Sequence, residues 1–317
     1  MFNHYNLKIY AFFVSLIILS SVFTFCKKKD PKIELVPNNT APYYNDVPRV
    51  KVENYVNRLF IDVIGREPLK TEMAAETDKL IAEKLSVSAR ETLITKLQSD
   101  QTFRAGDSSY AIAANNRIYD LLTVRLCEGF GEADFMYFYG IVQFYITQDS
   151  LYGNWAAYYN DKKDAADLLT AAKARWLYYH HEIDIEAYCA ALINNSITFG
   201  KTSSYMGNED NTIKYTFNDL LFRQYTKNEF LISRDMILNG KSGILFGKSG
   251  QSKGDYFTII THCNEFYEGT VKWLYKTYIA RSPTTEETIT AITNLPIDKD
   301  IFKIQRNILK TDEYANF

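Results

Sequence analysis

The sequence lacks an excess of charge of either sign. Its 317 residues include 36 Lys and Arg against 38 Asp and Glu, which gives a formal net charge of −2 at pH 7. Nucleic acids and anionic lipids attract proteins through broad basic surfaces, so this balance argues against a nucleic-acid partner. The length and an apolar content of 46% are those of a folded chain with a substantial core.

Cysteine is scarce, with four residues in the whole chain. Cys26 ends an apolar leader, so the rest of the chain holds only Cys127, Cys189 and Cys263. These three allow one disulfide at most, and three buried free thiols are an equally good alternative. The cysteine content therefore excludes a disulfide framework.

Proline is rare outside one segment, and strand patterns are few. Four of the seven prolines lie within residues 27–48, where they exclude helix and favour an extended tether. The clearest strand patterns are residues 243–246 and 256–261, which we expect to form a small β-hairpin. Everything else in the body favours an all-α fold.

The N-terminal residues have the pattern of an export signal. Lys8 precedes an almost wholly apolar stretch, residues 9–25. The stretch is either cleaved before Cys26, which is then lipidated, or retained as a membrane-spanning anchor. Its length of roughly 17 residues is at the short end for crossing a bilayer, and the lysines at 27–29 disfavour an uncleaved anchor.

Cys26-Lys27-Lys28-Lys29-Asp30 resembles the start of mature lipoproteins from Bacteroidota and spirochaetes. The resemblance implies a cell-envelope protein anchored by lipid on Cys26, in the outer membrane, with its periplasmic or surface face left open. We therefore expect a signal peptide at 1–25, a lipidated cysteine and proline-rich tether at 26–48, and a single helical domain at 49–317.

The two ends of the mature chain carry a repeated pattern. Apolar residues recur every three or four positions from Val52 to Ile64, as in an amphipathic helix, and again from Tyr267 to Ile279. Both helices are followed by an arginine, a proline two residues later and a glutamate four residues after that. We expect similar three-helix units at 50–105 and 267–317, with capping boxes at Thr284–Glu287 and Ser88–Glu91. An aromatic residue at the end of each unit (Phe103, Tyr314) should pack back on the first helix.

This pattern, Gly65-Arg66-x-Pro68 and Ala280-Arg281-x-Pro283 each followed by a glutamate, resembles the helical segments of planctomycete cytochrome-associated surface proteins. The likeness covers residues 50–105 and 267–317 only. The Cys-x-x-Cys-His haem motif that often accompanies that family is absent from this chain, so the resemblance implies no electron transfer. The motif residues are expected to end one helix and cap the next.

The middle of the chain predicts more helices, connected by two loops. Helices are expected at 112–126, 135–146, 165–179, 183–193 (ending at Asn194-Asn195) and 217–238. Loops are expected at 199–213 and at 240–254, where five of the 14 glycines lie.

The sequence contains no complete motif for a cofactor, a metal or a nucleotide. Gly247-Lys248-Ser249 lacks the glycine that a phosphate-binding loop needs five residues earlier, because position 242 is serine. His180 and His181 are adjacent and cannot share a metal as an i, i+4 pair on a helix can. His262-Cys263 near Glu265 is a weaker candidate. We expect no catalytic residues, no metal, no cofactor and no nucleotide.

One cluster is a weak candidate for ligand binding. Glu182 and Glu186 are expected on one helix face, beside aromatic side chains that could form a floor for a sugar. The simpler interpretation is a solvated helix surface. The candidate residues are Trp155, Trp176, Tyr178, Tyr179, Glu182 and Glu186.

The leading functional expectation is a non-enzymatic accessory or scaffold subunit of an envelope or surface assembly, with an envelope protein as partner. A glycan- or peptide-binding lipoprotein is the alternative, and a carboxylate-dependent hydrolase the second. A scaffold should have a broad flat patch, and a binding module a concave face lined by exposed aromatics. A hydrolase should have two facing carboxylates in a cleft.

Overall fold

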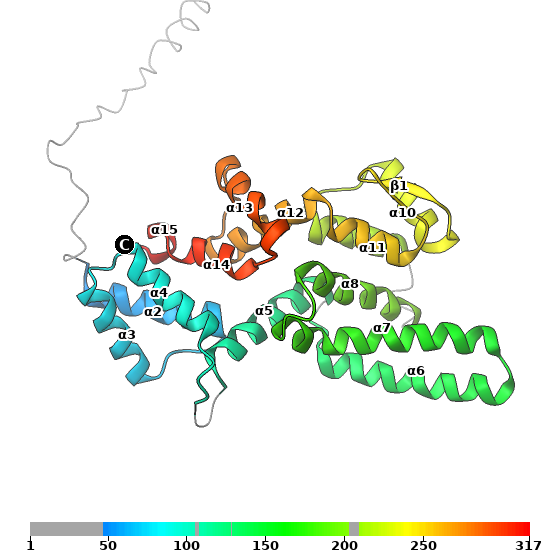
Figure 1. Ribbon diagram of the computed structural model, residues 1–317, viewed down its shortest axis with the longest axis horizontal. Coiled ribbons are helices and arrows are strands. Elements are labelled where there is room, and N and C mark those ends of the chain that lie inside the picture. Colours follow the sequence, from blue (N-terminus) through cyan, green and yellow to red (C-terminus); the bar gives the residue numbers. More distant parts are fainter. Residues whose placement is uncertain (1–46, 105–107, 128, 203–208) are drawn as a thin grey trace, which may run out of the picture. The chain divides into compact units, whose positions relative to one another are not determined.

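The computed structural model describes residues 47–104, 108–127, 129–202 and 209–317 (Figure 1). The predicted signal peptide, Cys26 and nearly all of the tether lie outside these residues. Within them, none of the helices is both long and apolar enough to cross a membrane.

The N-terminal three-helix unit forms as predicted. It consists of α2 (Arg49–Ile64), α3 (Lys70–Ala82) and α4 (Val87–Ser99). The α2 stripe from Val52 to Ile64 is buried along its whole length. The predicted capping box at Ser88 is wrong, because α4 begins earlier: Ser86 is its N-cap and accepts a hydrogen bond from the Ala89 N–H at 3.2 Å.

The C-terminal unit has the same order of helices: α12 (Asn264–Ile279), α13 (Thr285–Asp298), α14 (Ile301–Leu309) and the short α15 (Asp312–Ala315). The predicted capping box is confirmed, since Thr284 N–H donates to Glu287 at 2.7 Å and Glu287 N–H donates to Thr284 at 3.2 Å.

The two units pack on each other, and their terminal aromatics differ. Tyr314 is buried, its ring centre lies 6.0 Å from that of Tyr55, and its hydroxyl donates to Asp62 at 2.7 Å. It therefore packs on the first helix of the opposite unit. Phe103 is 76% exposed, so its predicted packing is wrong.

The middle of the chain is helical. It contains α5 (Tyr110–Cys127), α6 (Glu132–Tyr152), α7 (Trp155–Tyr179), α8 (Ile185–Thr202) and α9 (Glu209–Tyr215). Because α8 continues beyond Asn194-Asn195 and α9 begins at Glu209, the loop predicted at 199–213 is helical at both of its ends.

The predicted helix at 217–238 is interrupted. A π-helical turn, η2 (Thr216–Leu220), follows α9, and the chain then bends before α10 (Lys227–Asn239).

A hairpin follows α10. Its strand β1 (Gly243–Leu245) is paired antiparallel with β2 (Lys248–Gly250), so the loop predicted at 240–254 is largely ordered. The expected second strand at 256–261 is wrong. These residues belong to α11 (Lys253–Thr261), which begins with a reciprocal cap between Ser252 and Asp255.

The bend after η2 is a third copy of the Arg–Glu corner seen at the two ends. In each copy a residue with positive φ precedes the arginine, namely Gly65 (76°), Phe222 (54°) and Ala280 (56°). The arginine then binds the glutamate six residues later with two hydrogen bonds and donates to the next backbone carbonyl. The glutamate in turn accepts the N–H of the residue that precedes the next helix. The pairs are Arg66–Glu72, Arg223–Glu229 and Arg281–Glu287.

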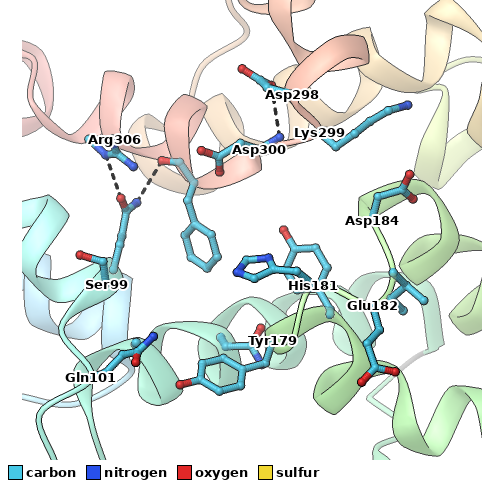
Figure 2. Close-up of a pocket in the computed structure, with 16 residues that line it drawn as sticks. Ser99, Gln101, Tyr179, His181, Glu182, Asp184, Asp298, Lys299, Asp300 and Arg306 are labelled. Atoms are coloured by element: carbon cyan, nitrogen blue, oxygen red, sulfur yellow. Dashed lines mark hydrogen bonds between the residues drawn. The ribbon is translucent and has the colours of Figure 1, made fainter.

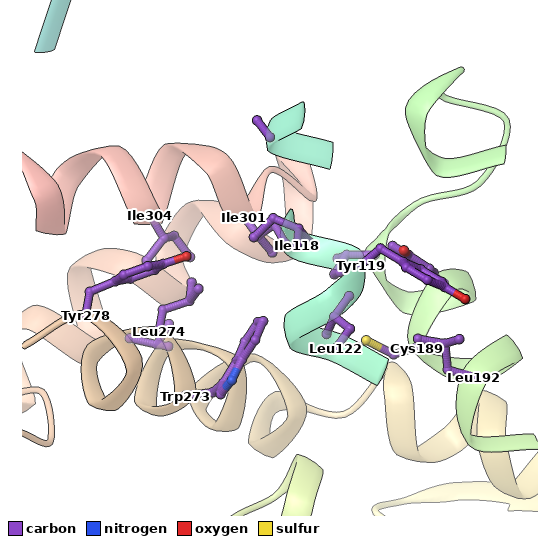
Figure 3. Close-up of a cluster of buried hydrophobic side chains, with 14 of the residues drawn as sticks. Ile118, Tyr119, Leu122, Cys189, Leu192, Trp273, Leu274, Tyr278, Ile301 and Ile304 are labelled. Carbon is purple, nitrogen blue, oxygen red and sulfur yellow. The ribbon is translucent and has the colours of Figure 1, made fainter. Parts of the chain in front are cut away.

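These elements share one hydrophobic core. Within it, α5 packs on helices of the N-terminal unit and on helices of the middle of the chain. Figure 3 shows Ile118 and Leu122 of α5 in a cluster with Cys189 of α8, Trp273 of α12 and Ile301 of α14. The all-α fold class is confirmed, with one two-stranded sheet in the part of the chain that the structure describes.

Candidate functional site

Two surface features could carry a function, and the first is an open groove of about 660 Å³. The turn after α7 forms one wall, and the turn between α13 and α14 faces it (Figure 2). The end of α4, one turn of α5, and Phe302 and Arg306 of α14 (Ile301–Leu309) form the rest of the lining. The lining residues are Gln98, Ser99, Gln101, Ala111, Asn115, Tyr178, Tyr179, His181, Glu182, Ile183, Asp184, Asp298, Lys299, Asp300, Phe302 and Arg306.

The groove joins the two repeat units through Gln98. Its side-chain amide donates to Gln305 Oε1 at 2.8 Å and to the carbonyl of Phe302 at 3.0 Å, and it accepts from Arg306 Nε at 2.9 Å. Nearby, Asn115 is 5% exposed and donates to the carbonyl of Arg175 at 3.2 Å, while its Oδ1 has no hydrogen-bond partner.

Three of the four carboxylates that line the groove, those of Asp184, Asp298 and Asp300, make structural contacts. Asp184 accepts the N–H of Ala187 at 2.9 Å and caps α8, and Asp300 accepts the N–H of Lys303 at 3.2 Å and caps α14. Partial burial opposes the charge on Asp298, but hydrogen bonds from Lys303 and from the Asp300 N–H outweigh it and lower the pKa of Asp298. A general acid needs a raised pKa, so this arrangement does not favour the hydrolase alternative.

Beneath the groove, Lys299 enters a buried polar network centred on Glu186. The Glu186 side chain is 1% exposed and binds Lys299 Nζ, the Tyr267 hydroxyl and, at 2.8 Å, His262 Nε2. Burial opposes the charge on Lys299, but the hydrogen bonds to Glu186 and Tyr267 outweigh it and raise the pKa of Lys299. The network joins α8, α12, the end of α11 and the turn after α13.

The residues predicted to bind a ligand do not all lie together in the structure. Tyr178, Tyr179 and Glu182 line the groove, whereas Glu186 lies in the buried network. The expectation that Glu182 and Glu186 share a helix face is wrong. The helix α7 ends at Tyr179, the chain turns through His181 with a φ of 58°, and Glu186 lies in the first turn of the next helix, α8.

The two tryptophans lie elsewhere on α7, each 54% exposed. Trp155 is the first residue of α7. Trp176 packs on the ring of His180, with ring centres 4.1 Å apart. Neither lines the groove, so the aromatic candidates do not form a single sugar-binding floor.

The remaining chemical candidates are also separated. His262 contacts Glu186, Cys263 is buried at the start of α12, and Glu265 pairs with Arg223 at 2.5 Å. Among the described residues no three His, Cys, Asp or Glu side chains are placed to hold a metal ion. Gly247-Lys248-Ser249 lies at the hairpin turn and in β2.

Cys127, Cys189 and Cys263 are all free thiols. All three are buried, which raises the pKa of Cys127 and of Cys189 to about 12 and also raises that of Cys263. Of the two alternatives left open by the sequence, the structure has the buried thiols.

The second surface feature is the outer face of α6. This helix packs extensively only on α7, among the elements that the structure describes, and lies antiparallel to it (Figure 1). Phe135 and Val142 are its only buried residues. Large apolar side chains on the other face are exposed: Met136 43%, Tyr137 67%, Phe144 60%, Tyr145 52%, Leu151 73% and Tyr152 82%.

Charge is absent from most of this face. Between Asp134 and Asp149 the helix has no charged residue. The exposed face of α7, by contrast, includes Lys163, Thr170 and Lys173. A large apolar patch on a soluble body usually marks an interaction site.

Comparison with protein-family models, with curated proteins and with solved structures finds no match to this chain.

Proposed function

We propose that this protein is a non-enzymatic accessory or scaffold subunit of a cell-envelope assembly, held at the outer membrane by lipid on Cys26. Its body would dock on an envelope protein through the outer face of α6. The exposed, uncharged apolar face of that helix is the observation that carries the proposal. An exposed apolar face of this kind supports a docking surface better than it supports the cavity of an enzyme.

The other two functions have less support. The groove is large enough for a peptide or sugar, but only Tyr178 and Tyr179 of the candidate aromatics line it, and Trp155 and Trp176 do not. The groove carboxylates Asp184 and Asp300 cap helices.

Site-specific photo-crosslinking in native membranes tests the proposal. A photoreactive amino acid at Tyr137 of the full chain should form adducts with an envelope protein or with a second copy. The same probe at Thr170, on the polar face of α7, is the control and should form few adducts. Phe144→Glu should abolish the adducts at position 137, because it places a charge in the apolar face. Equal labelling from both positions, or no adducts from either, would overturn the proposal.

A further inference from the structure

We infer that α6 is a self-association surface, on which α6 of a second copy of this chain packs in the antiparallel direction. The inference rests on the proposed function, because it names a partner for the docking face proposed above.

The exposed residues of α6 have the spacing of paired helices. The six that form the centre of the face follow one another at alternating steps of four and three residues, and all six face solvent: Ala133, Tyr137, Gly140, Phe144, Thr147 and Leu151. This spacing keeps one stripe of side chains facing a neighbouring helix over several turns. The residues that pack on α7, Phe135 and Val142 among them, lie on the opposite side of the helix.

The stripe is complementary to itself when one copy is reversed. A twofold axis near Val142 places Ala133 opposite Leu151, Tyr137 opposite Thr147, and Gly140 opposite Phe144. Each of the three layers then pairs a small residue with a large one, as close packing between two helices requires. A parallel dimer would instead place Phe144 against Phe144 and glycine against glycine.

The charged residues of α6 also favour the antiparallel direction. The helix contains three acidic residues and no basic one, namely Glu132, Asp134 and Asp149. Across the twofold axis these positions lie opposite Tyr152, Ser150 and Phe135, so no two carboxylates face each other. The lack of Lys and Arg also distinguishes α6 from helices that bind membrane surfaces, which carry basic residues beside their apolar face.

The size of the surface predicts a weak dimer. A helix of 21 residues is about 30 Å long. One such helix pair buries on the order of 1,000 Å² in total, at the low end for specific interfaces. We therefore expect a micromolar Kd, so that the dimer forms mainly where the chains are concentrated on a membrane.

Cysteine crosslinking of the full chain in membranes tests the direction. Ala133→Cys and Leu151→Cys, coexpressed on separate chains, should form a dimer with a short bis-maleimide. Each variant alone should crosslink at least fivefold less, because equal positions lie far apart in the antiparallel arrangement. The unsubstituted chain is the control for Cys26 and the buried thiols. Equal yields from the single variants, or no dimer above the control, would overturn the inference.

A size exchange tests the packing. A Cβ at Gly140 would meet nothing within 4 Å among the described residues, so a side chain can be introduced there without a clash at Cβ. When it is added to the Ala133→Cys and Leu151→Cys chains, Gly140→Phe should reduce the dimer yield at least fivefold. It would place a phenylalanine at position 140 against Phe144 of the second copy. Adding Phe144→Ala should restore the yield, because each layer again pairs large with small. Failure of the second change to restore it would contradict the proposed register.

The two proposals fail differently. If photo-crosslinks from Tyr137 join only another protein and cysteine crosslinking yields no dimer, the self-association is wrong and the docking face stands. If neither experiment yields an adduct, both proposals are wrong.

Discussion

Replacing Lys299 with methionine removes one positive charge from the buried network and keeps the length of the side chain. Glu186 would then retain its bonds to the Tyr267 hydroxyl and to His262, but lose the ammonium that compensates its charge. We expect this variant to be one of the more destabilising single changes in the body that does not touch the apolar core.

The magnitude follows from burial. Breaking a buried ion pair costs about 3–5 kcal/mol, because the remaining charge is uncompensated. The Lys299 side chain is 25% exposed, so water can partly replace it and we take the lower end, about 3 kcal/mol. For a body of this size that corresponds to a decrease in Tm of roughly 6–12 °C. Glu186→Gln combined with Lys299→Met should cost less than the sum of the single changes.

Urea unfolding followed by far-UV circular dichroism measures the loss, and Lys303→Met is the matched control. Lys303 binds Asp298 at 2.7 Å with its side chain 47% exposed, so its removal should cost less than about 1 kcal/mol. The raised pKa of Lys299 means that its contribution is complete below the unfolded pKa. It should disappear only as the pH rises through the higher folded value. Equal losses in the two methionine variants would refute the reasoning.

Two further predictions concern the backbone and the corners. A Cβ at Gly269 would lie 1.7 Å from the carbonyl oxygen of Leu220, so Gly269→Ala should lower the unfolding free energy by about 3 kcal/mol or more, measured by urea unfolding. Gly140→Ala, in an open position, should instead raise it by about 0.5–1 kcal/mol, and equal effects would contradict the close approach. Hydrogen bonds from Arg223 lower the pKa of Glu229 to about 2, so its contribution is present above the unfolded pKa and is lost as the pH falls toward 2. Glu229→Gln should therefore cost about 1 kcal/mol at pH 7 and almost nothing near pH 2, and a pH-independent difference in Tm would exclude this mechanism.

Local patterns predicted the helices of the two terminal units well. The α2 stripe and the cap at Thr284 need only neighbours along the chain, and both are confirmed. The prediction of a second hairpin strand at residues 256–261 is wrong. It rests on the aromatic and β-branched side chains in which these residues are rich. The reciprocal cap formed by Ser252 and Asp255 is a short-range signal for a helix that outweighs that composition.

The turns at which one helix ends and the next begins are harder to predict from the sequence. Phe222 and His181 both adopt a positive φ without glycine or proline to mark the turn. The spacing of Arg223, Thr226 and Glu229 matches the other two corners and could have revealed the first of these turns. Glu186 and Lys299 are 113 residues apart, so no local pattern joins them.

The sequence of α6 could not show which of its faces is buried, because apolar residues surround the helix. The structure uses one face against α7 and leaves the other to solvent. Gly269 and Gly140, both inside helices, also differ in whether another part of the chain packs against them. Gly269 is required by the approach of α12 to Leu220, whereas Gly140 lies in open space and weakens its helix by about 1 kcal/mol relative to alanine. Among the residues that the structure describes, none lies against Gly140, and in the proposed dimer a phenylalanine from a second copy of α6 would occupy the space beside it.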